Sequence, residues 1–309
     1  MIVELHAETD IGRVRRGNED NFLVLDLSIK QAWTGLDNTE PPAALRRLEL
    51  TPEGVVLVVS DGMGGALAGD VASRMAVEIV RELLMNGKVD AAGKTAAEKS
   101  LVKGLWDAIR YANLAIHHRS LEDAHCSGMG ATFTGVAVTP KELDMVQVGD
   151  SRAYVIRDDE IRLVTKDQSL VQQLIDIGQI SEQEAETHMF RNVILQALGA
   201  QREVVPVVYH VPLRRNDMLL LCSDGLSGKL SAQEMQNIIQ SSKSNLAAAC
   251  MRLVEEANVR GGEDNITVVL ARFTGEDLAE SRSEAVTVET LSLEEDTTLS
   301  RDNYVAESL

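Results

Sequence analysis

Two apolar runs in this chain end in the same three residues, Ser-Asp-Gly. The run at residues 55–59 leads to Asp61, and the run at residues 218–222 leads to Asp224. Each run has the length and apolar content of a buried β-strand. Asp-Gly on its own is also a common turn signal, which leaves the ordinary interpretation open for a single occurrence. Because two expected strands end in the same residues, we interpret them as lying on two sides of one acidic site at the edge of a sheet.

Three further aspartates stand at junctions of expected strands: Asp20 before residues 22–27, Asp150 after residues 143–148 and Asp264 before residues 266–273. No Cys or His lies among the five aspartates, and oxygen-only sites favour Mg²⁺ or Mn²⁺ over zinc. Two such ions about 4 Å apart would bridge a water, lower its pKa and hold an in-line displacement at phosphorus. Gly62 has no Cβ, so its carbonyl could approach a metal closely.

Basic residues precede an acidic pair in residues 13–20, where Arg15 is followed by Glu19 and Asp20. A charge run of this kind is usually a solvated loop. The functional interpretation is an anion site beside a cation site, in which Arg15 binds a phosphate through two hydrogen bonds.

Composition limits the class of protein. The chain has 309 residues with 44% apolar content, which is enough for one large domain or two modest ones. A net charge of −18 argues against a nucleic acid or an anionic membrane as the main ligand. Three cysteines without CxxC spacing favour a reducing compartment, and there is no signal peptide or apolar run near the ~18 residues of a membrane span. We therefore expect a cytoplasmic protein.

Apolar residues at helical spacing predict amphipathic helices over residues 72–84, 101–116 and 246–257. Residues 28–54 have mixed polarity and predict a long loop or insertion, with a helical turn at 43–48. Residues 169–200 predict a helical lid between strands, with a capping box at Ser181 and Glu184 and a further helix over 188–198.

The segment from residue 275 to residue 309 differs from the rest of the chain. It carries ten acidic residues against two arginines, is rich in Ser and Thr, and has no lasting periodicity. This composition is typical of disorder. We therefore expect a domain at residues 1–274 and a disordered acidic tail at 275–309.

From about residue 3 to residue 273 the chain resembles the bacterial members of the type 2C (PPM family) metal-dependent Ser/Thr protein phosphatases. Six motifs in the order of that family carry the resemblance: Thr9-Asp10-Ile11-Gly12 with Arg15 to Asp20, Asp61-Gly62-Met63-Gly64-Gly65, Gly130-Ala131-Thr132, Gly149-Asp150-Ser151-Arg152, Ser223-Asp224-Gly225-Leu226 and Gly262-Glu263-Asp264-Asn265.

The resemblance implies an α+β fold, a four-layer α-β-β-α sandwich of two central antiparallel sheets flanked by helices. The metals would lie in a channel at one end. Asp61 would bridge two Mn²⁺ or Mg²⁺ ions, the Gly62 carbonyl would bind one of them, and Asp224 and Asp264 would bind the other. Residues 1–274 would then be a phosphatase catalytic domain.

The resemblance also assigns roles around the two ions. Asp150, together with Asp224, would hold a third ion. Asp20 and Glu19 would hold metal-bound waters, and Arg15 would bind the substrate phosphate. The residues expected to carry catalysis are therefore Arg15, Asp20 and Asp61.

Three positions depart from the pattern of the family. Met63 stands where the animal enzymes have a histidine proposed as general acid. Bacterial members also have methionine at this position. Ala131 and Met189 replace residues that the family often has, and neither is an expected ligand. Residues 166–198 would form the flap that shapes substrate choice.

The expected activity is hydrolysis of phosphoserine and phosphothreonine in proteins, with phosphotyrosine as a lesser substrate, which would reverse a Ser/Thr kinase in signalling. The expected partners are phosphoprotein substrates and such a kinase, with no nucleic acid or membrane, and the chain is expected to be monomeric. One alternative is a sporulation or stress-response phosphatase acting on an anti-anti-sigma partner. Another is an inactive module that binds phosphoproteins, against which the presence of all five aspartates argues.

Overall fold

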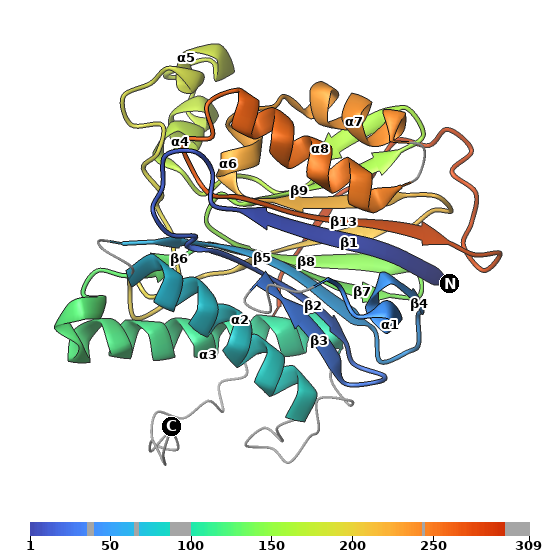
Figure 1. Cartoon of the computed structure of the whole chain (residues 1–309), viewed down its shortest axis with the longest axis horizontal. Helices are drawn as coiled ribbons and strands as arrows, with labels where there is room; N and C mark the ends of the chain where they lie inside the picture. Colours follow the sequence, from blue (N-terminus) through green and yellow to red (C-terminus); the bar gives the residue numbers. More distant parts are fainter. Residues whose placement is uncertain (36–39, 65–67, 87–99, 243–244, 294–309) are drawn as a thin grey trace.

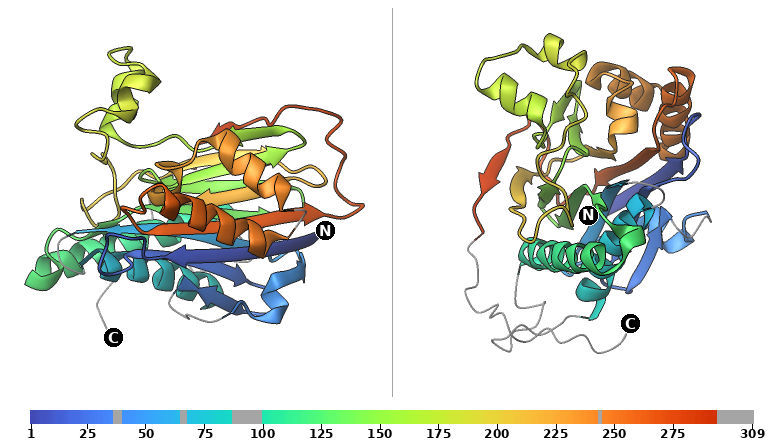
Figure 2. Two further views of the ribbon diagram at one scale, coloured as in Figure 1. Left: turned by 45° about the horizontal axis from the view of Figure 1, so that its top comes forward. Right: turned by 90° about the vertical axis from the view of Figure 1, so that its left-hand side faces the viewer.

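The computed structural model describes residues 1–35, 40–64, 68–86, 100–242 and 245–293. In these residues two antiparallel sheets lie face to face, and helices cover the outer face of each sheet (Figures 1 and 2). The expected four-layer α+β sandwich is confirmed.

The six-stranded sheet has the order β10-β9-β12-β13-β1-β4. Its strands are β1 (Ile2–Asp10), β4 (Arg47–Glu49), β9 (Arg152–Arg157), β10 (Glu160–Leu163), β12 (Met218–Cys222) and β13 (Ile266–Thr274). The strand nearest the start of the chain, β1, lies beside β13 over nine residue pairs, from Ile2 opposite Thr274 to Asp10 opposite Ile266.

The eight-stranded sheet has the order β14-β11-β8-β7-β5-β2-β3, with the short β6 also paired to β5. Its strands are β2 (Asp20–Asp26), β3 (Gln31–Thr34), β5 (Val55–Met63), β6 (Gly130–Ala131), β7 (Phe133–Thr139), β8 (Glu142–Val148), β11 (Val207–Pro212) and β14 (Glu289–Leu291). All residues of β2 are buried, and β5 is buried through Ser60, as expected for strands covered on both faces.

Helices α2 and α3 lie below the eight-stranded sheet in Figure 1, and α7 and α8 lie above the six-stranded one. The helices are α1 (Ala43–Arg46), α2 (Ala68–Asn86), α3 (Leu101–Glu122), α4 (Leu170–Asp176), α5 (Glu182–Glu186), α6 (Asp224–Ser227), α7 (Ala232–Ser241) and α8 (Leu246–Val259), with a 3₁₀ turn at Ala124–Cys126. The three predicted amphipathic helices are α2, α3 and α8. Helix α7 was not predicted, although a capping box at Ser231 and Glu234 marks its start.

Three apolar clusters hold the layers together. One fills the space between the sheets, where Leu57 and Phe273 are fully buried. A second lies between the eight-stranded sheet and α2 and α3, and a third between the six-stranded sheet and α6, α7 and α8. Since aromatics are only 3% of the chain, these clusters consist mainly of Val, Leu, Ile and Ala.

The prediction of a long loop over residues 28–54 is wrong in part. The segment contributes β3 to the edge of one sheet and β4 to the edge of the other. The expected helical turn is α1, which is shorter than predicted. Edge strands of three or four residues give too short a pattern to recognise against mixed polarity. Residues 36–39 lie outside the described part.

The predicted helix over residues 188–198 is also wrong. The capping box at Ser181 and Glu184 is present and opens α5, but the residues after α5 form turns. Their backbone groups bond to other segments: the Leu170 N–H donates to Val193 O, and the Leu195 N–H donates to Gln168 O. Pairing with these segments replaces the hydrogen bonds that a helix would need.

The 275–293 segment is ordered, so the prediction of disorder is wrong for these residues. Leu278 and Val286 are buried against the core between the sheets, and β14 pairs with β11. The amino group of Met1 lies 2.8 Å from Asp277 Oδ2. The fold therefore continues past residue 274, and residues 294–309 lie outside the described part.

Among the described residues, no helix combines the length and the apolar character that a membrane crossing requires. Helices α4 and α5 project from the sandwich at the end of the sheets where β5 and β6 finish (Figure 2).

Candidate metal centre

The two Ser-Asp-Gly sequences meet at one end of the sandwich, one from each sheet. Asp61 lies in β5 directly opposite Asp20 of β2. Asp224 opens α6 after β12, and Asp264 comes two residues before β13. Burial, followed by the charges of the surrounding aspartates, raises the pKa of Asp61 well above its ordinary value, and Asp150 is among those aspartates. The structure thus brings all five predicted aspartates together.

Three carboxylate oxygens in this cluster have no hydrogen-bond partner among the described residues, although they are buried: Asp20 Oδ1, Asp150 Oδ1 and Asp224 Oδ1. Leaving a buried carboxylate oxygen without a partner is costly, and several like charges in one place add to the cost. Divalent cations remove both penalties. An oxygen-only donor set of this kind fits Mg²⁺ or Mn²⁺.

Ser223 orients Asp20. Its hydroxyl donates to Asp20 Oδ2 at 2.7 Å and accepts from the Thr267 N–H at 3.0 Å. Burial raises the pKa of Asp20 to about 7. Asp20 is therefore part of the buried wall of the cluster, fixed through one oxygen and free at the other.

The Gly-Ala-Thr motif supports Asp61 through Thr132. The Asp61 N–H donates to Thr132 Oγ1 at 2.9 Å, and the Thr132 N–H donates to Asp61 O at 2.8 Å. Thr132 Oγ1 lies 2.7 Å from Ser151 Oγ, the serine that follows Asp150. One hydroxyl pair thus links the strand that carries Asp61 to the turn that carries Asp150.

Gly62 packs directly against Gly69 at the start of α2. A Cβ at Gly62 would lie 2.1 Å from Gly69 O and 2.6 Å from Glu19 O. Packing alone therefore requires glycine at position 62, whatever its carbonyl binds. Gly65, the last residue of this motif, lies outside the described residues.

Arg15 and Asp264 form an ion pair of 2.8 Å at the mouth of the cluster, with side chains 47% and 35% exposed. Glu19 lies beside them, and burial raises its pKa while the charge of Arg15 opposes the rise. Arg15 thus lies at the mouth of the cluster, with a carboxylate as its present partner.

Asn265 is a site residue whose role the sequence did not reveal. Its Oδ1 accepts from the Glu19 N–H at 2.8 Å, and its Nδ2 donates to Ile11 O and Gly17 O. One buried amide therefore holds the loop that carries Arg15 and Glu19 against Asp264. Its position in the Gly-Glu-Asp-Asn motif was the available signal.

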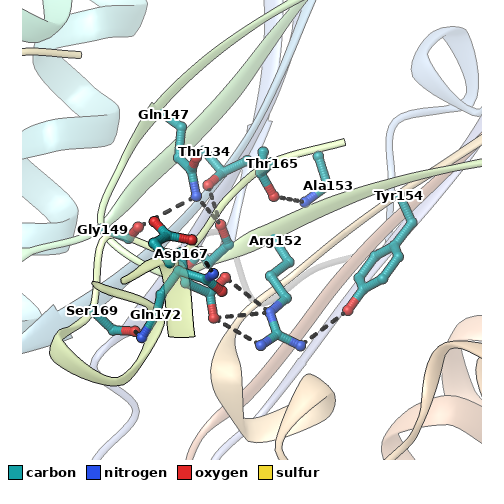
Figure 3. Close-up of polar contacts among 12 residues, drawn as sticks. Thr134, Gln147, Gly149, Arg152, Ala153, Tyr154, Thr165, Asp167, Ser169 and Gln172 are labelled. Carbon is teal, nitrogen blue, oxygen red and sulfur yellow. Dashed lines mark hydrogen bonds and ion pairs between the residues drawn. The ribbon is translucent and has the colours of Figure 1, made fainter. Parts of the chain in front are cut away.

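Asp150 forms the side of the cluster nearest the flap. Its turn needs glycine at position 149, which has φ +99° and whose Cβ would lie 2.8 Å from Thr132. Burial, then the charges of Asp224 and Asp167, raises the pKa of Asp150 to about 7. Figure 3 shows Arg152 between Asp167 and Tyr154, with its guanidinium donating to both Asp167 oxygens.

Comparison with known proteins agrees with this geometry. The family model described as protein phosphatase 2C matches residues 44–260. The chain belongs to the protein phosphatase 2C family. It is 36% identical over 268 residues to the serine/threonine phosphatase stp of Listeria innocua, an alignment that covers 86% of this chain and 95% of that protein.

Solved structures of the family superpose on this fold. The catalytic domain of PstP in complex with two manganese ions has a TM-score of 0.69 and 31% identity, covering 89% of this chain and 99% of that one. Stp1 of Staphylococcus aureus has a TM-score of 0.72 and 29% identity, covering 88% and 96%. These matches confirm the resemblance to bacterial protein phosphatase 2C enzymes and the classification of the chain as a phosphatase of this metal-dependent family.

Proposed function

We propose that this phosphatase hydrolyses phosphoserine and phosphothreonine in proteins by in-line attack of water on the phosphoryl group. The three buried carboxylate oxygens without partners, delivered from both sheets, are the observation that carries the proposal. Asp61, the Gly62 carbonyl, Asp224 and Asp264 would hold two Mn²⁺ or Mg²⁺ ions, and Asp150 with Asp224 a third. When bound, such ions would polarise the phosphoryl group and lower the pKa of a water molecule.

Arg15 would bind the substrate phosphate. Its guanidinium carries a permanent charge and can donate two parallel hydrogen bonds to phosphate oxygens. The present ion pair with Asp264 holds the guanidinium at the mouth of the cluster. A phosphate that arrives there would compete with Asp264 for Arg15 and free an Asp264 oxygen to face a metal.

Asp20 would accept a proton from the attacking water. Its Oδ2 is fixed by Ser223, and its buried Oδ1 has no partner among the described residues. An ionised carboxylate at this position suits general base catalysis. Glu19 would hold a further water at the rim. Because Met63 cannot donate a proton, water or another residue must protonate the leaving group.

Activity of metal-stripped protein on p-nitrophenyl phosphate, with and without added Mn²⁺, tests the proposal together with Asp61→Asn. We expect hydrolysis only with Mn²⁺ and its loss in the variant. Asp176→Asn on α4 is the matched control, since Asp176 is an exposed carboxylate paired with Lys166. Inactivity of folded, Mn²⁺-loaded protein would contradict the proposal and favour the module that binds phosphoproteins.

Phosphopeptides then test the substrate class. We expect phosphoserine and phosphothreonine peptides to be hydrolysed faster than a phosphotyrosine peptide of the same sequence. The names of the relatives, which are serine/threonine phosphatases, support this order and the proposal that the enzyme opposes a Ser/Thr kinase. Faster release of phosphate from phosphotyrosine would reverse the assignment.

A further inference from the structure

Gln168 joins the base of the flap to the turn that carries Asp150. Its side-chain Oε1 accepts from the Gly149 N–H at 2.8 Å, and its backbone N–H donates to Gly149 O at 3.0 Å. Its carbonyl accepts from the Leu195 N–H on the returning segment of the flap at 2.7 Å. One residue thus contacts both sides of the flap base and the residue directly before Asp150.

The amide nitrogen of the same side chain is buried and has no hydrogen-bond partner within the described part of the chain. The amide cannot be reversed to satisfy it, because Nε2 would then face the Gly149 N–H, donor against donor. A buried donor without a partner costs stability, so its retention calls for a partner in the working protein.

Asp150, which directly follows Gly149, has a complementary feature, an acceptor without a donor. Its Oδ1 is a buried acceptor without a partner, and it does not bond to Gln168 Nε2. The carboxylate requires a positive group, whereas the amide requires an oxygen lone pair. A cation beside Asp150 that carries an oxygen atom, from water or from a phosphoryl group, meets both requirements, since the cation pairs with the carboxylate and the oxygen accepts from the amide.

Resting on the proposed function, we propose that Gln168 is a positioning residue of the Asp150 side of the centre. Its Nε2 donates a hydrogen bond to an oxygen atom bound beside Asp150, and its Oε1 keeps that donor aligned through Gly149. The oxygen belongs either to the phosphoryl group of the substrate or to a water in the shell of an ion held by Asp150.

The flap base has other attachments that would survive a change at Gln168. Arg152 forms an ion pair of 2.7 Å with Asp167, directly before Gln168 (Figure 3). Ser169 pairs with Ile194, and the Leu170 N–H donates to Val193 O. Substitution of Gln168 therefore tests the amide and leaves the base of the flap attached.

Two variants separate the donor from the link to Gly149. Gln168→Met removes both amide functions at nearly the same length. Gln168→Glu keeps an acceptor for the Gly149 N–H but replaces the donor by an oxygen. Gln172→Met is the matched control, because the amide of Gln172 lies in the same segment and donates to Asp176 at the surface.

Binding is measured directly in two arms, calorimetric titration of inorganic phosphate into Mn²⁺-loaded protein and electron paramagnetic resonance of Mn²⁺ without phosphate. If the oxygen is phosphoryl, Gln168→Met weakens phosphate binding by about tenfold and leaves Mn²⁺ binding unchanged. If it is a water, Gln168→Met weakens Mn²⁺ binding by about the same factor. Gln168→Glu should weaken phosphate binding at least as much as Gln168→Met does, because a carboxylate oxygen would then face a phosphate oxygen. The same variant should strengthen Mn²⁺ binding.

Wild-type affinities for both ligands in Gln168→Met would overturn the proposal and leave the amide with an ordered water only. Wild-type phosphate and Mn²⁺ affinities in Gln168→Glu, with losses confined to Gln168→Met, would overturn the donor role and leave only the link to Gly149. Both arms measure binding, so their outcome is independent of turnover. Failure of the proposed function would appear separately, as a wild-type protein that binds these ligands and hydrolyses no phosphopeptide.

Discussion

The five-residue strand β12 has an aspartate just beyond each end, and the two differ in their hydrogen-bond partners. Asp217, before the strand, is bound by Arg157 through two hydrogen bonds of 2.9 and 2.8 Å and by the Arg214 N–H at 2.8 Å. Asp224, after the strand, has a buried oxygen with no partner among the described residues, and burial raises its pKa. The hydrogen bonds of Asp217 are complete within the protein, whereas Asp224 keeps an open oxygen, as the proposed cation site requires.

Whether the oxygens of a carboxylate all have partners within the protein distinguishes a structural charge from a functional one. A buried carboxylate whose acceptors are all used contributes to the fold, and removing it leaves its partner without compensation. A cluster whose acceptors are left open lowers stability until a ligand binds. The end of the sandwich with Asp217 should therefore govern stability, and the end with Asp224 should govern activity.

The largest expected effect concerns activity. Asp224→Asn should lower kcat/KM for p-nitrophenyl phosphate by about 10³-fold or more, because it removes a carboxylate from the metal cluster. Asp217→Asn should leave kcat/KM of the folded protein unchanged. Steady-state kinetics at saturating Mn²⁺ measures both, and equal losses in the two variants would break the comparison.

The second effect concerns stability, and here the variant at Asp217 should have the larger effect. Asp217→Asn should lower the free energy of unfolding by about 3 kcal/mol, because Arg157 is then buried without its counter-charge. In the presence of a chelator, Asp224→Asn should leave the free energy of unfolding unchanged or raise it. Urea unfolding of both proteins measures this. The double variant Arg157→Met/Asp217→Leu should recover most of the loss, and its failure to do so would point to a role beyond the ion pair.

Truncation extends the comparison to the 275–293 segment, which covers the Asp217 end. Ala285 O accepts from Arg157 Nη1 at 3.4 Å, and Leu278 and Val286 are buried. Ending the chain at Thr274 should lower the free energy of unfolding by about 2 kcal/mol or more without changing kcat on p-nitrophenyl phosphate. Ending it at Leu293 should change neither quantity. A loss of kcat in the folded, shorter protein would connect this segment to the metal centre.

The last expected effect is a dependence of stability on pH. The pKa values of Asp20 and Asp150 are raised to about 7 from an ordinary value of 3.8, so the folded state binds more protons than the unfolded state between these values. In chelator, stability should therefore rise as pH falls from 8 to 6, by up to about 1.4 kcal/mol per pH unit for each proton.

Saturating Mn²⁺ should flatten this dependence, because the metal competes with the protons for the same oxygens. The variant Asp20→Asn/Asp150→Asn should reduce the dependence without metal, leaving the part that comes from Asp61 and Asp224, whose pKa values burial also raises. Thermal unfolding across the pH range distinguishes these cases, and an unchanged slope in the double variant would assign the protons to other groups.

The sequence predicted the carboxylates because each follows or precedes an apolar run, and strand ends collect at sheet rims. It did not predict the bonds that aim them. Neither the hydrogen bond from Ser223 to Asp20 nor the three bonds of Asn265 follow from local pattern, since they join residues about 200 to 250 positions apart.

The errors have equally physical causes. The 275–293 segment resembles a disordered tail because its apolar residues are sparse and aperiodic, yet Leu278 and Val286 suffice to hold it on the core. Residues 188–198 have a composition suited to a helix, but the flap base uses their backbone groups for pairing with distant residues. In both regions tertiary contacts outweigh local propensity.

The position of β1 also has a consequence for synthesis of the protein on the ribosome. β1 lies between β13 and β4, and the loop that follows it is held by Asn265. Its principal neighbour is therefore translated more than 250 residues later. At about 5–20 residues per second, the delay is on the order of tens of seconds. Until Asp264 and Asn265 have left the exit tunnel, a growing chain lacks the fifth aspartate and the amide that holds the loop of Glu19, so the cluster cannot form before synthesis is nearly complete.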